Sequence, residues 1–237
     1  MEKTISKRGI VFLLLFTALA LVGMQFNFSK VIGMDNQTFT FFQFFGPIAG
    51  GFLGAFGIVA VLFAQLINFV ISGKETTLVN ILRLTPMLFA AYYFSKNRQT
   101  GFSDKLSIAI PLAAMLIFWT NPAGLGAWYY ALFWTIPIIA KFLPDMLVLR
   151  SLGATFTAHA IGSSIWVLTV PMTAAQWAML VPVTATERLL FAAGIAVSYV
   201  VFTNILNMAD KAWDITKFVN IDQRYVLSPM PAKAKKE

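Results

Sequence analysis

The stretch FFQFFGPIAGGFLGAFG, from Phe41 to Gly57, sets five glycines and one proline inside a strongly apolar segment. Glycine and proline are the two residues that least favour a helix in water. Proline fits the first turn of a helix but breaks its interior. We therefore predict a turn at Gly46–Pro47 and a full helix over 48–71 that begins just after it.

The composition predicts that this apolar chain lies in a membrane. Of its 237 residues, 58% are hydrophobic and only 12% are charged, whereas a soluble domain carries about 25% charged residues. We therefore expect a protein of the cell membrane, surrounded by the lipid bilayer. The formal net charge of +8 does not indicate nucleic-acid binding, because the basic residues flank apolar runs, where they set membrane orientation.

The sequence offers little to a metal, a cofactor or a catalytic nucleophile. It has no cysteine and one histidine, so neither a thiolate metal site nor a haem site built by the protein is expected. It contains no P-loop and no nucleotide-binding glycine motif. The GSS at Gly162–Ser164 does not form a G-x-S-x-G elbow, and one histidine does not by itself make a catalytic triad. We expect no enzyme, no cofactor and no metal site.

Apolar runs long enough to cross a bilayer predict an all-α transmembrane helical bundle of six to eight helices, broken at Gly46–Pro47. Its expected spans are about 9–26, 47–71, 77–95, 105–120, 127–142, 148–170 and 184–208. A short helix over 37–45 adds one crossing. With it, both termini and the basic loop over 96–105 fall on the cytoplasmic side. Residues 1–210 then form one transmembrane domain, and 211–237 form a cytoplasmic interfacial segment and basic tail.

Polar and ionisable side chains inside the apolar runs are candidates for a binding site, because they are costly in a membrane. Non-helical backbone at membrane depth is tolerated only beside protein or a water-filled cavity, so the predicted break indicates an internal cavity. In this topology the polar and aromatic residues gather in the outer half of the membrane, which is typical of a small-molecule site. The candidate substrate-binding residues are Gln43, Asn80, Arg83, Asn121, Trp128, His159, Ser163, Trp166, Glu187 and Arg188.

Structural roles for these residues stay open beside the binding roles. Arg83 would pair with Glu187 or hold an anionic group of a ligand, and His159 would donate to a ligand or bond a backbone carbonyl. Tryptophan near the end of a span is also typical of the interfacial belt. Glu187 and Arg188 are expected at the start of the last helix. They would form a structural pair that orders loops, but because adjacent residues on a helix do not face each other, we expect these two to have different partners.

Two stripes of small residues predict close approach between helices, since small side chains let backbones come together in lipid. The stripes are Gly46, Gly50 and Gly54 in the opening stretch, and Ala154, Ala158 and Gly162 further along the chain. They are expected either to pack within this chain or to dock a separate membrane partner.

A basic start, a first helix, an outside loop and a short helix that leads into FFGPIAGGFLGAFG resemble the substrate-binding S components of energy-coupling-factor (ECF) transporters. In that family a G-P-x-x-G pattern opens the third helix, which matches Gly46, Pro47 and Gly50. The segments AHAIGSSIW, from Ala158, and PVTATERLLFAAG, from Pro182, also resemble the last two helices of such proteins.

The resemblance implies a membrane-embedded subunit that captures a vitamin or a similar small solute from the outer face. It also implies a membrane partner of the T type and ATPases on other chains. Two alternatives stay open. One is a scaffold subunit of a membrane complex with no role in transport. The other is a self-sufficient secondary carrier, for which inverted repeats are typical, and the sequence contains no clear repeat.

Overall fold

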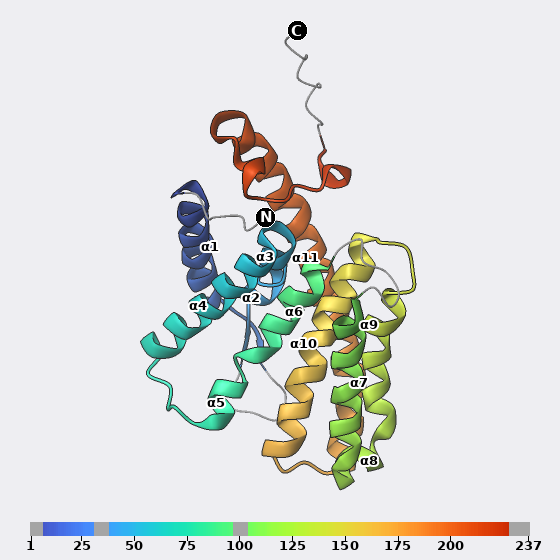
Figure 1. The fold of residues 1–237 in the computed structure, drawn as a ribbon. Coiled ribbons are helices and arrows are strands. Elements are labelled where there is room, and N and C mark those ends of the chain that lie inside the picture. Colours follow the sequence, from blue (N-terminus) through green and yellow to red (C-terminus); the bar gives the residue numbers. More distant parts are fainter. Residues whose placement is uncertain (1–6, 31–37, 97–103, 228–237) are drawn as a thin grey trace.

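The computed structural model describes residues 7–30, 38–96 and 104–227, and most of this chain is helical (Figure 1). The helices are α1 (Lys7–Gln25), α2 (Phe42–Phe45), α3 (Ile48–Leu53), α4 (Ala55–Ile71), α5 (Leu78–Leu82), α6 (Thr85–Ser95), α7 (Lys105–Thr120), α8 (Pro122–Gly126), η2 (Trp128–Trp134), α9 (Thr135–Ala140), α10 (Leu147–Thr169), α11 (Ala174–Trp213), η3 (Ile215–Lys217) and η4 (Gln223–Tyr225). Two short strands, β1 (Asn27–Lys30) and β2 (Thr38–Thr40), pair as an antiparallel hairpin. The prediction of a helical fold is confirmed, with this hairpin as the exception.

Helix α10 lies at the centre of the helices that form one half of the molecule. It packs against α6, α7, α9 and α11, while α1 packs against α4, and α3 contacts both α4 and α6 (Figure 1). The expected spans 105–120 and 148–170 agree with α7 and α10 to within one residue at each end. These two runs have no strong helix breaker near their centres, except for Pro111 in α7, whose helix continues through it.

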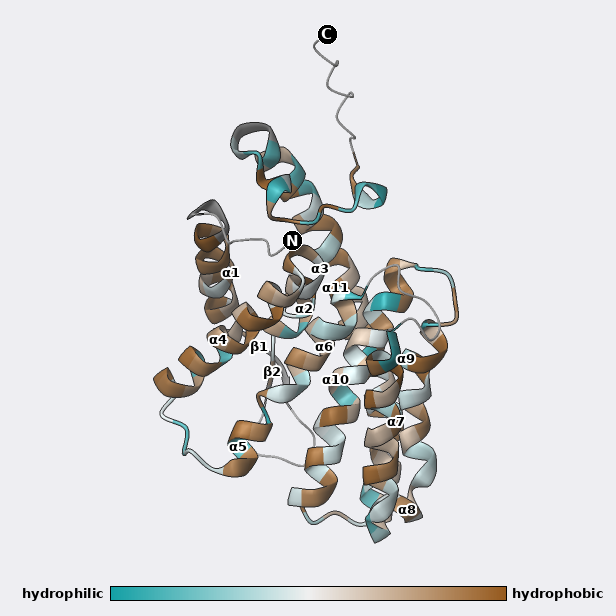
Figure 2. Ribbon diagram, in the orientation of Figure 1, coloured by the Kyte–Doolittle hydropathy of each residue, from teal (hydrophilic) through white to brown (hydrophobic). Residues whose placement is uncertain are grey.

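Many large apolar side chains face outward instead of into the core, and hydrophobic residues make up much of the ribbon of several helices in Figure 2. Leu15 of α1, Val70 of α4, Leu168 of α10 and Val197 of α11 are all exposed. Within the described residues one helix, Ala174–Asp210, is both long and apolar enough to span a membrane. Shorter apolar helices occur at Ile10–Gln25, Phe42–Leu53, Ala55–Ile71, Lys105–Thr120 and Trp128–Ala140.

The predicted short helix over 37–45 is wrong in its first part. Residues Thr38–Thr40 form β2, and only Phe42–Phe45 form a helical turn. The sequence Thr-Phe-Thr favours a strand, because β-branched and aromatic side chains fit a pleated surface. The hairpin continues into the helix through a hydrogen bond from the Phe41 N–H to the Phe26 carbonyl oxygen, at 2.9 Å. Residue 37 itself lies outside the described residues.

The sharpest break in the opening stretch lies at Gly54 and not at the predicted turn. A helix does end at Phe45 and another begins at Ile48, yet Gly46 and Pro47 keep helical φ angles of −53° and −62°. Gly54 instead has φ +59°, a conformation that glycine adopts without the steric cost that other residues meet. The predicted continuous helix over 48–71 is therefore wrong, since this glycine divides it into α3 and α4.

Other predicted spans differ from the observed helices for local reasons. The run 77–95 is divided into α5 and α6, because Pro86 sits at the start of α6 and cannot continue α5. The run 127–142 is divided into η2 and α9. The last helix begins ten residues earlier than predicted, where Thr173 and Gln176 form a capping box.

One end of the molecule gathers the start of α1, the end of α6, the starts of α7 and α10, and the segment after α11. Phe12 of α1 contacts Phe218, Arg224 pairs with Asp145 at 2.7 Å, and the Asn220 N–H donates to the Phe52 carbonyl oxygen at 2.8 Å. The described part of the tail is thus packed against the helices.

A buried ion pair joins three elements at this same end. The Lys141 ammonium lies 3.2 Å from a carboxylate oxygen of Asp104, and the Tyr92 hydroxyl donates to the same carboxylate at 3.0 Å. Burial raises the pKa of Asp104, but the Ser107 hydroxyl and the Lys141 charge outweigh that effect and hold this pKa below its usual range. The pair links the start of α7 to α6 and α9.

Replacing Gly50 by alanine tests the close contact between α3 and α6. A Cβ atom at Gly50 would lie 1.9 Å from the Ala91 carbonyl oxygen, which belongs to backbone and cannot rotate away. We expect Gly50→Ala to lower the free energy of unfolding by about 1 to 3 kcal/mol, measured by thermal unfolding in detergent.

The matched control is Gly162→Ala, where the nearest atom to the new Cβ is Pro86 Cγ at 3.9 Å. This helical position has room for a Cβ atom, so the thermal unfolding midpoint of Gly162→Ala should stay unchanged or rise. Equal midpoints for the two variants would contradict the contact.

Candidate functional site

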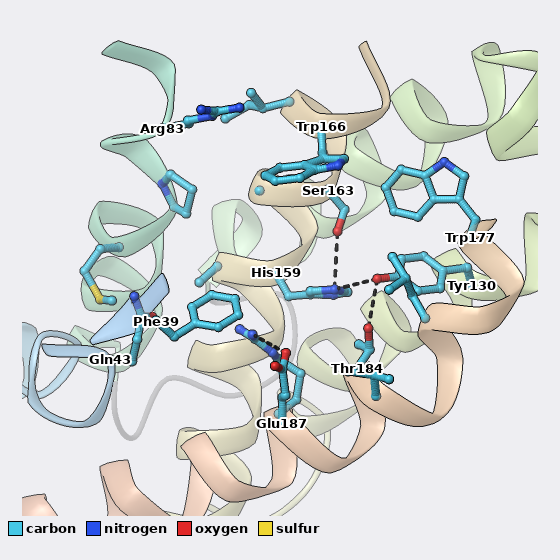
Figure 3. A pocket seen from close by; sticks show the side chains of 18 of the residues that line it. Phe39, Gln43, Arg83, Tyr130, His159, Ser163, Trp166, Trp177, Thr184 and Glu187 are labelled. Carbon is cyan, nitrogen blue, oxygen red and sulfur yellow. Dashed lines mark hydrogen bonds and ion pairs between the residues drawn. The ribbon is translucent and has the colours of Figure 1, made fainter. Parts of the chain in front are cut away.

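A cavity of about 280 Å³ lies between α10 and α11, and other elements border it (Figure 3). Helix α10 contributes Ala158, His159, Gly162, Ser163, Ile165 and Trp166, and α11 contributes Trp177, Leu180, Val183, Thr184, Glu187 and Arg188. The remaining lining residues are Phe39, Gln43, Gln65, Arg83, Pro86, Met87 and Tyr130. The wall is therefore aromatic and polar together, which is typical of a small-molecule site.

His159 is held in one tautomer by its neighbours. The Trp134 indole N–H donates to His159 Nδ1 at 3.0 Å. Because an indole nitrogen only donates, Nδ1 must carry no proton. The neutral ring then bears its proton on Nε2, which lies 3.0 Å from the Tyr130 hydroxyl and 3.3 Å from the Ser163 hydroxyl. His159 thus donates to these hydroxyls and carries no charge.

The hydrogen bonds of His159 continue across the cavity wall to α11. The Tyr130 hydroxyl lies 2.9 Å from the Thr184 hydroxyl, so η2, α10 and α11 are joined through His159 and Tyr130 (Figure 3). Tyr130 also stacks on Phe118 and meets Trp177 edge to face. These contacts fix the rotamers on the cavity wall, as a preorganised site requires.

Glu187 and Arg188 lie about a third of the way along α11 and both border the cavity. Arg188 is 3% exposed, and its guanidinium lies 3.5 Å from a Glu187 carboxylate oxygen. The same guanidinium carbon lies 4.5 Å from the Phe191 ring centroid and 4.9 Å from that of Phe39, which comes from the hairpin. The prediction that these adjacent residues have different partners is therefore wrong, because the long arginine side chain bends back to its neighbour.

Arg83 borders the cavity at the break between α5 and α6. It is the C-cap residue of α5, and its guanidinium carbon lies 5.3 Å from the Trp166 ring centroid. The Gln65 side-chain amide donates to the Leu84 carbonyl oxygen at 3.0 Å, which holds the break in place. None of the ion pairs among the described residues includes Arg83, so the predicted pairing with Glu187 is not observed.

Seven of the predicted substrate-binding residues border the cavity, namely Gln43, Arg83, His159, Ser163, Trp166, Glu187 and Arg188. Three others lie elsewhere. The Asn80 amide donates to the Glu75 carbonyl oxygen at 2.9 Å, and the Asn121 side chain caps α8. Trp128 is 53% exposed. Asn80, Asn121 and Trp128 were predicted as substrate-binding residues because they are polar or aromatic and lie near a helix end. That signal does not distinguish an amide that caps a helix from a side chain that contacts a ligand.

Sequence reasoning did not select Phe39, Gln65, Tyr130, Trp177 and Thr184 as substrate-binding residues, yet all five border the cavity. Thr184 and Trp177 precede Glu187 by three and ten residues. Thr184 already lay in the expected span 184–208, one turn before Glu187, whereas the place of Trp177 on this helix would have followed from the true start of α11 at the Thr173–Gln176 capping box. Phe39 carried no comparable signal, because its position depends on the hairpin.

Most members of the two small-residue stripes lie against this chain's own helices. Gly46 and Gly50 contact α6 at Met87 and Ala91, and Ala154 and Ala158 are buried. Gly162 borders the cavity. Of the four glycines in the stripes, Gly54 has no atom within 4 Å of a Cβ built on it. Five of the six are thus placed where packing within the chain, or the cavity, occupies them.

The described residues contain no group of three or more His, Asp or Glu side chains placed to hold a metal ion. Comparison with protein-family models, with curated proteins and with solved structures finds no match for this chain.

The tautomer of His159 can be tested directly, because the chain contains one histidine. In protein labelled with ¹⁵N-histidine, NMR should show a neutral ring with its proton on Nε2 at pH 7. Trp134→Phe removes the only donor seen at Nδ1 and should give a mixture of tautomers, with a loss of about 1 to 3 kcal/mol in stability from the unsatisfied acceptor.

Trp128→Phe is the matched control, since this exposed tryptophan lies outside the cavity lining. It should leave the histidine spectrum unchanged. A wild-type spectrum with the proton on Nδ1 would contradict the hydrogen-bond assignment.

Proposed function

We propose that the chain is a multi-pass protein of the cell membrane, with both termini and the 96–105 loop on the cytoplasmic side. The outward-facing apolar side chains support this, because soluble monomers rarely expose large apolar areas. Helix α11 has 40 residues, or roughly 60 Å at about 1.5 Å per residue. Since a hydrocarbon core is about 30 Å thick, one end of α11 extends beyond it. The ion pairs around Asp104, Asp145 and Arg224 suit that aqueous end.

We propose further that the protein is the substrate-capture subunit of an ECF-type importer for a vitamin or a similar small solute. The observation that carries this proposal is the 280 Å³ cavity with its aromatic and hydrogen-bonding wall. The sequence resemblance adds the expected partners, which are a T-type membrane subunit and ATPases on other chains. The sequence itself contains no nucleotide-binding motif that would let this chain couple ATP hydrolysis to transport.

In this function the cavity residues have distinct roles. Trp166, Trp177 and Phe39 supply apolar area for the body of the solute. The Ser163 hydroxyl, which lies 3.3 Å from His159 Nε2, supplies a hydrogen bond that orients it. The hairpin contributes Phe39 next to Arg188, so closure over a solute would involve the hairpin and α11 together. Release toward the cytoplasm would require the partner subunit.

Mass spectrometry of small molecules released from the purified protein tests capture. We expect one compound in stoichiometric amount. Ser163→Ala should weaken its binding about 2- to 10-fold, the range for one hydrogen bond. The neighbouring Ser164 is the matched control. Its hydroxyl donates to the Ala160 carbonyl oxygen at 2.9 Å and does not border the cavity, so Ser164→Ala should bind normally.

A protein that releases no compound and purifies tightly with another membrane protein would support the scaffold hypothesis instead. Uptake into vesicles driven by an ion gradient, with no ATPase present, would support a self-sufficient carrier.

Cysteine labelling tests the proposed orientation, and the chain has no cysteine of its own. Lys74 and Lys105 are both exposed and lie in the loop after α4 and at the start of α7. In intact cells a membrane-impermeant maleimide should label Lys74→Cys, whereas Lys105→Cys should react only after the membrane is opened. Labelling of both from outside, or the reverse order, would overturn the orientation.

A further inference from the structure

The charges and unpaired donors that border the cavity define the chemistry of the solute more closely than its shape does. Three buried nitrogen atoms among the described residues have no hydrogen-bond partner and belong to side chains of the lining. They are Nε of Arg83, Nε of Arg188 and the indole nitrogen of Trp177. Buried polar groups are almost always paired, so an unpaired one in a cavity wall marks a position where a ligand group is expected.

All three of these nitrogens are donors and none can accept a hydrogen bond. Trp177 is 2% exposed and Arg188 is 3% exposed, so water on the protein surface does not reach them freely. A solute acceptor atom is therefore expected at one or more of these donors. A solute rich in N–H groups would leave them unpaired.

The lining also has a surplus of one positive charge. Arg83 and Arg188 contribute two positive charges, and Glu187 contributes one negative charge. His159 adds none, because the Trp134 donor at Nδ1 leaves it neutral. Glu187 lies 3.5 Å from Arg188, whereas Arg83 lies over the Trp166 ring and takes part in no ion pair among the described residues. The unbalanced charge therefore belongs to Arg83, which lies apart from Glu187 in the view of Figure 3.

We propose that the solute is a monoanionic aromatic carboxylate whose carboxylate is held by Arg83. A guanidinium presents parallel N–H groups that match a carboxylate. A phosphate monoester carries about −1.5 to −2 charges and would leave the site with an excess of negative charge. Trp166, Trp177 and Phe39 surround the space in which an aromatic body would lie. The cavity volume of about 280 Å³ is just below the usual range of about 300 to 1,000 Å³, which restricts the solute to a small one.

This inference rests on the proposed capture function and specifies its substrate. The test uses full-length protein in detergent and measures the shift of the thermal unfolding midpoint with three probes of increasing size. These are benzoate, indole-3-carboxylate and naphthalene-2-carboxylate. Each carboxylate is compared with its primary amide. Phenyl phosphate and naphthyl phosphate serve as the doubly charged comparison for benzoate and naphthalene-2-carboxylate. The carboxylates should bind about 10- to 100-fold more tightly than their amides, as is typical of hydrogen bonds to a charged group.

Arg83 variants connect this preference to one side chain. Arg83→Gln should remove the preference for carboxylate over amide, while Arg83→Lys should keep part of it. Lys74→Gln removes an exposed positive charge outside the cavity lining and should leave the preference intact. Unliganded midpoints and size-exclusion profiles verify that each variant is folded.

The outcomes separate this inference from the function on which it rests. Amides or phosphates that bind as well as carboxylates, or a released natural compound without a carboxylate, would overturn the substrate class and leave capture standing. A full preference that survives Arg83→Gln would overturn the role of Arg83. If no probe of any charge shifts the midpoint and the purified protein also releases no compound, both the inference and the capture function fail.

Discussion

The hydrogen bonds of His159 hold together the part of the molecule in which the cavity forms. Through Trp134, Tyr130 and Thr184 they connect the three elements η2, α10 and α11. Each partner constrains the next, because an indole N–H fixes the tautomer and the tautomer fixes which atoms remain to donate. The shape of the wall and the donors it presents thus follow from one neutral ring.

The same wall contains charges that a protein core does not ordinarily accept. Arg188 is buried beside Glu187 and two phenylalanine rings, and Arg83 lies over Trp166 at the bend between α5 and α6. Removing a charge from water is costly unless it is paired. Aromatic faces offset part of that cost, and an acceptor on a bound solute would offset more. The arrangement is therefore better suited to a site that fills and empties than to a permanently closed core.

Particular residues show how far sequence patterns reach. The apolar runs that became α7 and α10 could be located to within a residue, because each helix continues through the proline or glycines inside it. The glycine-rich stretch indicated a break, but its position required a backbone angle, and Gly54 rather than Gly46 has the positive φ. Thr38–Thr40 belongs to a segment that the sequence predicted to be helical, and its pairing with 27–30 makes it a strand. Asn80 and Asn121 have the same polarity as the cavity residues, but their side-chain amides donate to the backbone carbonyl oxygens of Glu75 and Val167 instead.

By itself the sequence determined that this chain is helical, apolar enough for a membrane and poor in groups for metal or nucleophilic chemistry, since these follow from composition and local periodicity. It also indicated Arg83, His159, Ser163, Trp166, Glu187 and Arg188 as costly or unusual residues within apolar runs. Only the tertiary structure decided that these six meet at one cavity, and that Phe39, Tyr130 and Trp177 complete it. The physical reason is distance along the chain. Trp134 and His159 are 25 residues apart, and Tyr130 and Thr184 are 54 apart, and no local pattern specifies which helix faces will pack together.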